Sequence, residues 1–461
     1  MDTLCYRLSM SVTDSTIYSD LLQLAKSPGN AVVWSYDITV KVNGVAIKET
    51  ESQEINAFYD FKTRYYSDMF LFIQVTVSDY QTLMANPQSI TVEIVRTLTN
   101  PNTGVPGDVK QHYGTYLGYI TDPEDTEIMA LRHSGKDERA GDSSYMEIIL
   151  NLIEPYIADY RLADIGGVYK NTTVENLLRC VMGYGLGTSA NRVLLESPGY
   201  IGLKGVDVVT PDNQRVYQHI VIPNGTRIIH VPKYLQDHYG IYTGGLGWHI
   251  FNKICYIYPL LKNTEYAKRH KVLTIVNIPT DEIPTLEKTY THKDDQLYIF
   301  STGESKYVSV SEKVQLNIGN GFRFTRASDL IDLMEETTMN RSVWDAKLTV
   351  KTLLIHARPD ERQNIRFVDG RITDNPYKHV SKLVAGLGGF LTVSWTSADP
   401  ALLYPGMQTK IVYKARGRVQ SRMGTLTSVR ATTSTGSTKK DAGKSTSCEL
   451  EIYVQQRPQM A

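Results

Sequence analysis

The sequence contains the side chains that catalysis and metal binding use, but their spacing matches no familiar site. Ten histidines are present, and none stands in an HExxH or HxH pair of the kind that holds zinc. His219, His230, His238 and His249 are near one another in the sequence and could converge in space. Polar partnerships within a tyrosine-rich surface explain them more simply. We expect no metal site.

The acidic residues give no catalytic pattern either. Two clusters, at 122–127 and 137–142, lack the regular spacing of a calcium-binding loop. No GxSxG, Walker or nucleophilic-cysteine motif occurs. Two carboxylates could still meet as a glycosidase pair, so a cell-wall hydrolase stays an alternative. The favoured interpretation is that the protein is not an enzyme and uses no catalytic residue and no cofactor.

Glycines and cysteines have structural interpretations. The glycine clusters at 183–187, 244–247 and 386–389 lack GxGxxG spacing and follow predicted helices, where glycine forms a left-handed C-cap. The four cysteines are scattered without a metal-type spacing, which favours incidental thiols in a reducing compartment. They are Cys5, Cys180, Cys255 and Cys448.

Composition points to contacts with other proteins. Hydrophobic residues make up 41% of the 461 residues, which excludes wholesale disorder, and this length suggests about three domains. Tyrosine outnumbers phenylalanine by 30 to 10. Its apolar ring with a polar tip suits surfaces that are dry on one side and wet on the other. No run approaches the roughly 18 apolar residues of a membrane span, and no signal peptide is visible at the N-terminus.

The net charge is zero, but its distribution is uneven. Residues 401–461 hold five Lys and five Arg against three acidic residues, a net charge of +7, so the remainder carries −7. Arg416 and Arg418 are candidate interface residues in this basic part. A loop at 434–445, rich in Ser, Thr, Gly and Lys, is expected to be mobile between two strands. Contact with an acidic protein partner and a solvated charged face are both open.

Strands dominate the first part of the chain. Alternating apolar residues predict a strand at 32–42, and Asn43-Gly44 then predicts a type I′ hairpin turn. Further strands are expected at 69–77, 90–94 and 113–120. Because tight turns join them without intervening helices, a sandwich or small barrel is indicated. A short amphipathic helix is expected before them, at 17–27.

The middle of the chain mixes the two element types. A strand at 145–154 should stop at Pro155, and a capping box at Thr172–Glu175 should begin a helix. A short helix is expected at 233–239. A strand with one aromatic face follows, and its residues Trp248, Tyr256 and Tyr258 are expected to be exposed in the single chain and buried against another chain.

The last part of the chain is again rich in strands. They are predicted at 272–278, 296–300, 344–356, 390–395, 409–413, 418–432 and 447–454, with a helix opening at Asn375-Pro376. The expected domains are an arm at 1–30, a first β region at 31–125, a mixed module at 126–270, a second β region at 271–430, and a basic loop with a final strand at 431–461.

Several short phrases, together with this order of elements, resemble the hub proteins of contractile phage-tail baseplates. The phrases are Val168–Leu178, Val221–Thr226, Tyr234–Tyr242, Cys255–Pro259 and Tyr404–Met407. The resemblance implies a fold that is mainly β with α+β parts: two tail-tube-like antiparallel β-barrels and a mixed α/β central module. It carries over no catalytic residue.

The resemblance also implies an assembly. A homotrimer would place six similar barrels in a ring, which joins a sixfold tail tube to a threefold central spike. The expected partners are the tail tube protein, the spike protein and other baseplate proteins, with DNA or the tape measure only as cargo of the lumen. The expected location is the virion, after assembly in the host cytoplasm. A wedge or tube connector of the same tail is the alternative among structural proteins.

Overall fold

The computed structural model describes only part of the chain. The described residues are 18–19, 21–23, 25, 33–47, 51–99, 106–121, 145–183, 203–261, 272–279, 289–293, 296–302, 306–309, 375, 377, 381, 388–415, 418–434 and 445–455. Several expectations lie outside them: Cys5, the acidic clusters at 122–127 and 137–142, most of the glycine clusters at 183–187 and 386–389, the strand at 344–356, Arg416, and the loop 435–444.

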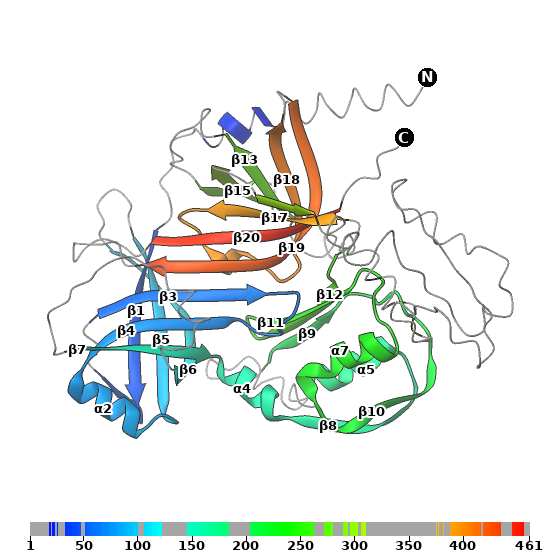
Figure 1. Ribbon diagram of the computed structural model, residues 1–461, viewed down its shortest axis with the longest axis horizontal. Coiled ribbons are helices and arrows are strands. Elements are labelled where there is room, and N and C mark those ends of the chain that lie inside the picture. Colours follow the sequence, from blue (N-terminus) through cyan, green and yellow to red (C-terminus); the bar gives the residue numbers. More distant parts are fainter. Residues whose placement is uncertain are drawn as a thin grey trace, which may run out of the picture.

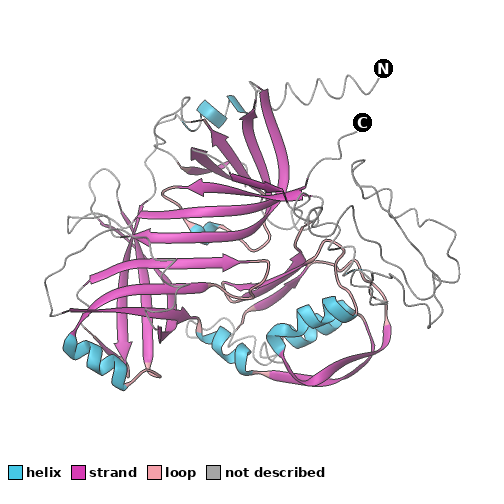
Figure 2. Cartoon of the chain, viewed as in Figure 1, coloured by secondary structure: helices cyan, strands magenta, loops and turns pink. Residues whose placement is uncertain are grey.

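The fold is mainly β, as expected from the sequence. Within the described residues, fifteen strands form one large sheet, and two small sheets of two and three strands accompany it. The longer helices lie along the lower edge of the view, and shorter helical segments lie at the top and in the middle (Figure 2). No helix in the described ranges is long and apolar enough to cross a membrane.

The first β region is entirely antiparallel. Its strands are β1 (Val33–Val42), β2 (Val45–Ala46), β3 (Glu51–Asp60), β4 (Asp68–Thr76), β5 (Ile90–Thr99), β6 (Pro106–Thr121) and β7 (Tyr145–Ile153). They pair in the order β3-β4-β7-β6-β5-β1-β2. Strand β7 pairs with β4 and β6 and so belongs to this sheet, although it lies within the 126–270 expected for the mixed module. The predicted hairpin turn is confirmed, because Asn43 and Gly44 both have positive φ, at 52° and 80°.

A helix replaces the end of one predicted strand. Strand β4 ends at Thr76, and helix α2 (Val77–Ala85) begins at once. The Thr76 side chain accepts a hydrogen bond from the Asp79 backbone N–H at 3.2 Å. This N-cap satisfies a helical donor, which explains why Val77 starts a helix although its apolar side chain extends the strand pattern.

The central module alternates helices and strands. Its elements are α4 (Pro155–Leu162), β8 (Asp164–Thr172), α5 (Val174–Met182), β9 (Gly205–Val208), β10 (Tyr217–Arg227), η2 (Ile228–His230), α7 (Val231–His238), β11 (Leu246–Phe251) and β12 (Ile254–Pro259). Strands β8 and β10 form an antiparallel ribbon, and β11-β12-β9 form a small sheet in which β9 and β12 run parallel. The ribbon passes outside α5 and α7 at the lower right (Figure 1).

Helix α5 starts one residue later than its predicted cap. Thr173, not Thr172, is the N-cap, and its side chain accepts from the Asn176 N–H at 3.2 Å. Glu175 therefore does not reach back to the cap, as a capping box requires. It forms an ion pair with Arg179 one turn later, at 2.9 Å.

The second β region contains parallel pairs. Its elements are β13 (Leu273–Ile278), β14 (Tyr290–Lys293), β15 (Gln296–Thr302), β16 (Lys306–Ser309), β17 (Gly388–Trp395), η5 (Pro400–Leu402), β18 (Gln408–Ala415), β19 (Arg418–Ser434) and β20 (Ser445–Gln455). Strand β20 pairs with β17 and β19 and so belongs to this region, although it lies within the 431–461 expected as a separate part. Strand β13 lies between β15 and β18 and runs parallel to both. The antiparallel expectation is therefore corrected here, because β13 is joined to its neighbours by crossover connections and not by hairpins.

The N-terminal arm packs on the second β region. Tyr18, Leu21 and Ala25 are buried against a small apolar cluster that includes Val276 and Phe300. Their spacing of three and four residues places them on one face of a helix, and the described residues of this segment are helical. The amphipathic helix predicted at 17–27 is thus confirmed at these positions.

Strand β19 joins the two β regions into one body. It pairs with β18 along its first half, with β20 along its second half, and with β3 through seven residue pairs from Ser428–Asp60 to Ser434–Glu54. Strand β1 also lies against β20. One apolar core runs through all three regions. Figure 1 shows the strands of the two regions stacked one above the other, with β19 and β3 adjacent.

Candidate functional site at the junction of the three regions

The aromatic residues expected at an interface lie in the core of the chain itself. Trp248, Tyr256 and Tyr258 expose only 6%, 4% and 0% of their surface. The alternating pattern led to the wrong expectation because both faces of this small sheet are covered, and each residue of β11 is buried. The indole N–H of Trp248 donates to the Ile229 carbonyl at 3.2 Å, so even its polar atom is satisfied internally.

Tyr258 fixes the central module to the second β region. Its ring lies against Gly247 of the neighbouring strand and against Gly406, and neither position has room for a Cβ atom beside the ring. Gly406 also has a φ of +67°, a conformation that favours glycine. Two of the phrases that resemble baseplate hubs, Cys255–Pro259 and Tyr404–Met407, therefore meet here.

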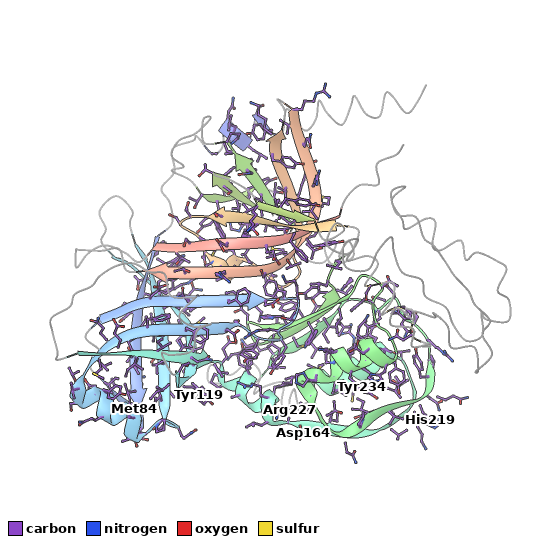
Figure 3. All side chains as sticks on the ribbon, in the orientation of Figure 1. Met84, Tyr119, Asp164, His219, Arg227 and Tyr234 are labelled. Carbon is purple, nitrogen blue, oxygen red and sulfur yellow. The ribbon has the colours of Figure 1, made fainter. Side chains whose placement is uncertain are left out.

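Two further phrases meet at the outer ribbon. The Val221 N–H donates to the Tyr239 hydroxyl at 2.9 Å, and the Tyr234 hydroxyl donates to the Val221 carbonyl at 2.9 Å. These hydroxyls satisfy backbone groups that a neighbouring strand would otherwise pair. Asp164, His219 and Arg227 lie along the same ribbon (Figure 3).

The four histidines do not converge. His219 is exposed on β10, and His230 lies edge-on to Tyr65 with ring centroids 5.9 Å apart. His238 stacks on Tyr234 at 4.2 Å. His249 is fully buried beside Phe61, and its Nδ1–H donates to the Arg64 carbonyl at 2.9 Å. The aromatic partners agree with the favoured interpretation for His230 and His238.

The described ranges contain no group of three His, Cys, Asp or Glu residues placed to hold a metal ion.

Cys255 and Cys448 are buried free thiols, whereas Cys180 is an exposed one. Burial raises the pKa of Cys255 to about 12, so its thiol stays protonated near neutral pH. Neither buried cysteine has the low pKa of a reactive nucleophile.

Arg418 is exposed where β19 begins, beside the hairpin from β18. Arg422, four residues along the same strand, is exposed as well, and Met423 exposes 47% of its surface. This end of the hairpin therefore presents basic and apolar groups together. The basic character that the sequence indicates lies at the surface here.

A buried ion pair connects the first β region to the second. The Arg96 guanidinium of β5 lies 2.8 Å from an Asp399 carboxylate oxygen, and the two side chains are only 8% and 5% exposed. Trp34 Nε1–H also donates to Asp399 at 3.2 Å, and Arg96 Nε–H donates to Gln111 at 2.9 Å. The guanidinium lies over the Trp34 ring, 4.1 Å from its centroid. The partners Arg96 and Asp399 are 303 residues apart in the sequence.

A cavity of about 390 Å³ lies next to this ion pair. Residues of β3 to β7 and of α4 form most of its wall, while Phe251 and Asn252 of the central module and Ala401 and Leu402 of η5 complete it. Its wall is strongly aromatic, with Tyr59, Tyr66, Tyr113, Tyr116 and Phe251. The three regions of the chain thus line one partly open cavity.

Glu154 is the carboxylate in the wall of this cavity. Burial raises its pKa to about 7, and the nearby Tyr156 hydroxyl and Lys253 ammonium offset part of that rise. Its charge in turn contributes to the raised pKa values of Tyr116 and Tyr156, for which burial is the main cause. The residues that line the cavity do not offer two carboxylates, so the glycosidase pair left open by the sequence does not form there.

Sequence reasoning missed both the ion pair and the cavity. Arg96, Asp399 and Glu154 carry no local motif, and they lie close to one another only through the tertiary fold. One signal was present, because Glu154 directly follows a strongly apolar strand and directly precedes Pro155. A charged residue at such a position is placed at the edge of a core.

No protein-family model and no curated protein matches this sequence. Similar solved structures include phage tail and baseplate proteins and a component of the type VI secretion system. The tail protein of Neisseria meningitidis MC58 is 12% identical with a TM-score of 0.40, and the match covers 90% of this chain and 96% of that one. The 43 kDa tail protein of prophage MuSo2 from Shewanella oneidensis is 12% identical with a TM-score of 0.41, over 92% and 99% of the two chains.

A third similar structure is an E. coli component of the type VI secretion system, itself described as similar to T4 bacteriophage tail proteins. It is 10% identical with a TM-score of 0.36, and the match covers 91% of this chain and 77% of that one. With identities of 12% or less and TM-scores below 0.5, these likenesses do not by themselves establish a common function.

Proposed function

We propose that this chain is a structural subunit of a phage-tail baseplate. In this role it acts as a hub, whose trimeric ring joins the sixfold tail tube to the threefold central spike. Its partners are then the tail tube protein, the spike protein and other baseplate proteins, and its location is the virion after assembly in the host cytoplasm. A wedge or tube connector of the same tail is the second candidate.

The observation that supports the proposal is the continuity of the large sheet. Strand β19 pairs with β18 and β20 of the second β region and with β3 of the first, and the buried Arg96–Asp399 pair fastens the same two regions. One chain therefore supplies two β-rich bodies in a fixed relative position. A trimer of such a chain presents six β bodies, which suits a subunit that adapts one symmetry to another.

The places where the hub-like phrases meet add support. The Tyr258 contact with Gly406 lies in the core, and the Tyr239 contact with Val221 holds the exposed outer ribbon to the chain. The residues that give the resemblance therefore hold the framework together. A structural protein needs such contacts at the joints between its parts, whereas an enzyme family is marked by residues in a reactive site.

We propose Arg418 as part of an interface with a neighbouring chain, because its charge is exposed at the basic end of the β18–β19 hairpin. Its partner would be an acidic protein surface, for which complementary charge speeds association and fixes orientation. The corresponding role of Arg416 is a proposal from the sequence.

Symmetry tests the proposed function. Negative-stain images of the purified full-length chain should show rings with threefold symmetry. Arg418→Glu should reduce the fraction of chains found in rings. Lys306→Glu, which also reverses a positive charge at an exposed site, on β16, should leave that fraction unchanged. A chain that stays monomeric at every concentration would overturn the hub role, and assemblies of another symmetry would favour the wedge or connector.

A further inference from the structure

We propose that the cavity at the junction binds a small organic cation through an alkylammonium group, with Glu154 as its counterion and tyrosine rings as its walls. This proposal goes beyond the structural role and does not depend on it. The chemical class follows from three features of the cavity: its aromatic wall, its half-buried carboxylate and its position.

The aromatic wall suits a positive charge. Tyr59, Tyr66, Tyr116 and Phe251 line the space, and the faces of such rings attract cations most strongly where water is excluded. The neighbouring structure already uses this chemistry. The Arg96 guanidinium lies 4.1 Å from the Trp34 ring centroid and 5.4 Å from that of Tyr113. That cation has its own carboxylate, Asp399.

Glu154 has no such cation in the described parts of the chain, where none of the ion pairs includes it. The charged and titratable groups around it are Lys253 from the β11–β12 turn, Tyr156 from α4, Tyr116 from β6 and Tyr59 from β3. Arg96 and His112 belong to the same cavity wall. The charge of Lys253 lowers the pKa of Glu154. A buried carboxylate gains most from a directly bound cation, because burial removes the water that otherwise stabilises its charge.

The volume and position of the cavity fit a small ligand. About 390 Å³ lies within the usual range of small-molecule pockets. Gln111, His112 and Asn252 line the cavity and are themselves exposed, so the space connects to solvent at their side. A ligand bound at Glu154 also contacts parts of all three regions, and its binding therefore stabilises their relative position.

Calorimetric titration of the full chain tests this site. The probe is 1,4-diaminobutane, and the neutral control of the same length is 1,4-butanediol. At pH 8 the diamine should bind at one site per chain, and the diol should bind at least about tenfold more weakly. Because Glu154 titrates near pH 7, the affinity should fall about tenfold between pH 8 and pH 6. Equal binding of diamine and diol, or no binding of the diamine, would overturn the proposal.

Variants assign the binding to Glu154. Glu154→Gln keeps the size of the side chain and should weaken diamine binding about 10- to 100-fold, while Glu449→Gln, the same change at an exposed site on β20, should not alter it. Tyr66→Leu provides a second test, because it removes a ring without touching the carboxylate and should weaken binding severalfold. Unchanged binding in Glu154→Gln would overturn the assignment.

A titration with Nα-acetyl-lysine amide identifies the source of the ammonium group. If this compound binds more tightly than 1,4-diaminobutane, the source is a lysine side chain, and if it binds more weakly, the source is a free amine.

Discussion

Two acidic residues at the junction, the fully buried Asp399 and the half-buried Glu154, differ in what surrounds them. Asp399 accepts hydrogen bonds from Arg96, Trp34 and the Ala401 N–H. Glu154 lies in the same neighbourhood without a directly bound cation among the described residues, and burial raises its pKa to about 7. The comparison shows that a fully buried carboxylate with three donors joins two regions, whereas a half-buried carboxylate without a directly bound cation responds to pH. Four measurements can break or sharpen this contrast.

The largest effect is expected from Asp399→Ala. This change leaves the Arg96 guanidinium buried without its carboxylate, which typically costs about 3–5 kcal/mol in the free energy of unfolding. Urea unfolding measures the loss. A reduction below about 1 kcal/mol would mean that solvent reaches Arg96 and that the pair does not hold the two β regions together.

Glu154→Gln should raise the free energy of unfolding at high pH, whereas Asp399→Ala lowers it. Below its ordinary pKa of 4.5, Glu154 is protonated in both the folded and the unfolded chain. As the pH rises from 4.5 to 7, only the unfolded chain releases the proton, so the wild-type protein loses stability, by up to about 3 kcal/mol at pH 8. The variant avoids this loss and should be the more stable protein at pH 8. A difference between the two proteins that stays constant from pH 5 to pH 8 would contradict the prediction.

His249 should make the protein less stable as the pH falls, whereas Glu154 makes it less stable as the pH rises. Burial lowers its pKa to about 4, from 6.5. As the pH falls below 6.5, the unfolded chain gains a proton that the folded chain does not bind, which costs about 2 kcal/mol of stability by pH 5. His249→Asn keeps a donor for the Arg64 carbonyl and removes the titration. Its free energy of unfolding should therefore fall less than that of the wild type between pH 7 and pH 5, as measured by urea unfolding at each pH.

The smallest effect is expected at an exposed ion pair. Lys41 and Glu93 are 2.8 Å apart, but each side chain is 36% exposed. Glu93→Ala should lower the free energy of unfolding by less than about 1 kcal/mol, because solvent and salt screen such pairs. Glu93→Ala removes a surface ion pair, whereas Asp399→Ala removes a buried one. A similar loss in the free energy of unfolding in both variants would show that burial does not set the strength of the Arg96–Asp399 pair.

Local features of the fold follow from the sequence. The Asn43-Gly44 turn, the end of β7 before Pro155 and the apolar face of the N-terminal helix each depend on neighbouring residues, so their patterns are readable. The three partners of β19, the parallel position of β13 and the Arg96–Asp399 pair depend on contacts between distant segments. Periodicity carries no information about which strands pair.

The aromatic residues of β11 and β12 show in the same way that a local pattern does not reveal tertiary contacts. Alternation in Trp248, Tyr256 and Tyr258 predicts a sheet with one apolar face, but it does not say whether the other face is covered as well. Here the glycines at 247 and 406 let the Tyr258 ring approach closely from both sides, and the whole face becomes core. Interface and interior give the same pattern in a sequence, because both exclude water.

The seam between β3 and β19 has a consequence for synthesis. Strand β3 ends at Asp60, whereas its partner residues in β19 begin at Ser428. During translation, the first β region therefore waits for more than 360 further residues before that edge is paired. Throughout this time the nascent chain presents unpaired backbone N–H and C=O groups along β3, which is the kind of edge that recruits other strands. The pairing of β19 with β3, one of the first strands made, can therefore form only late in synthesis.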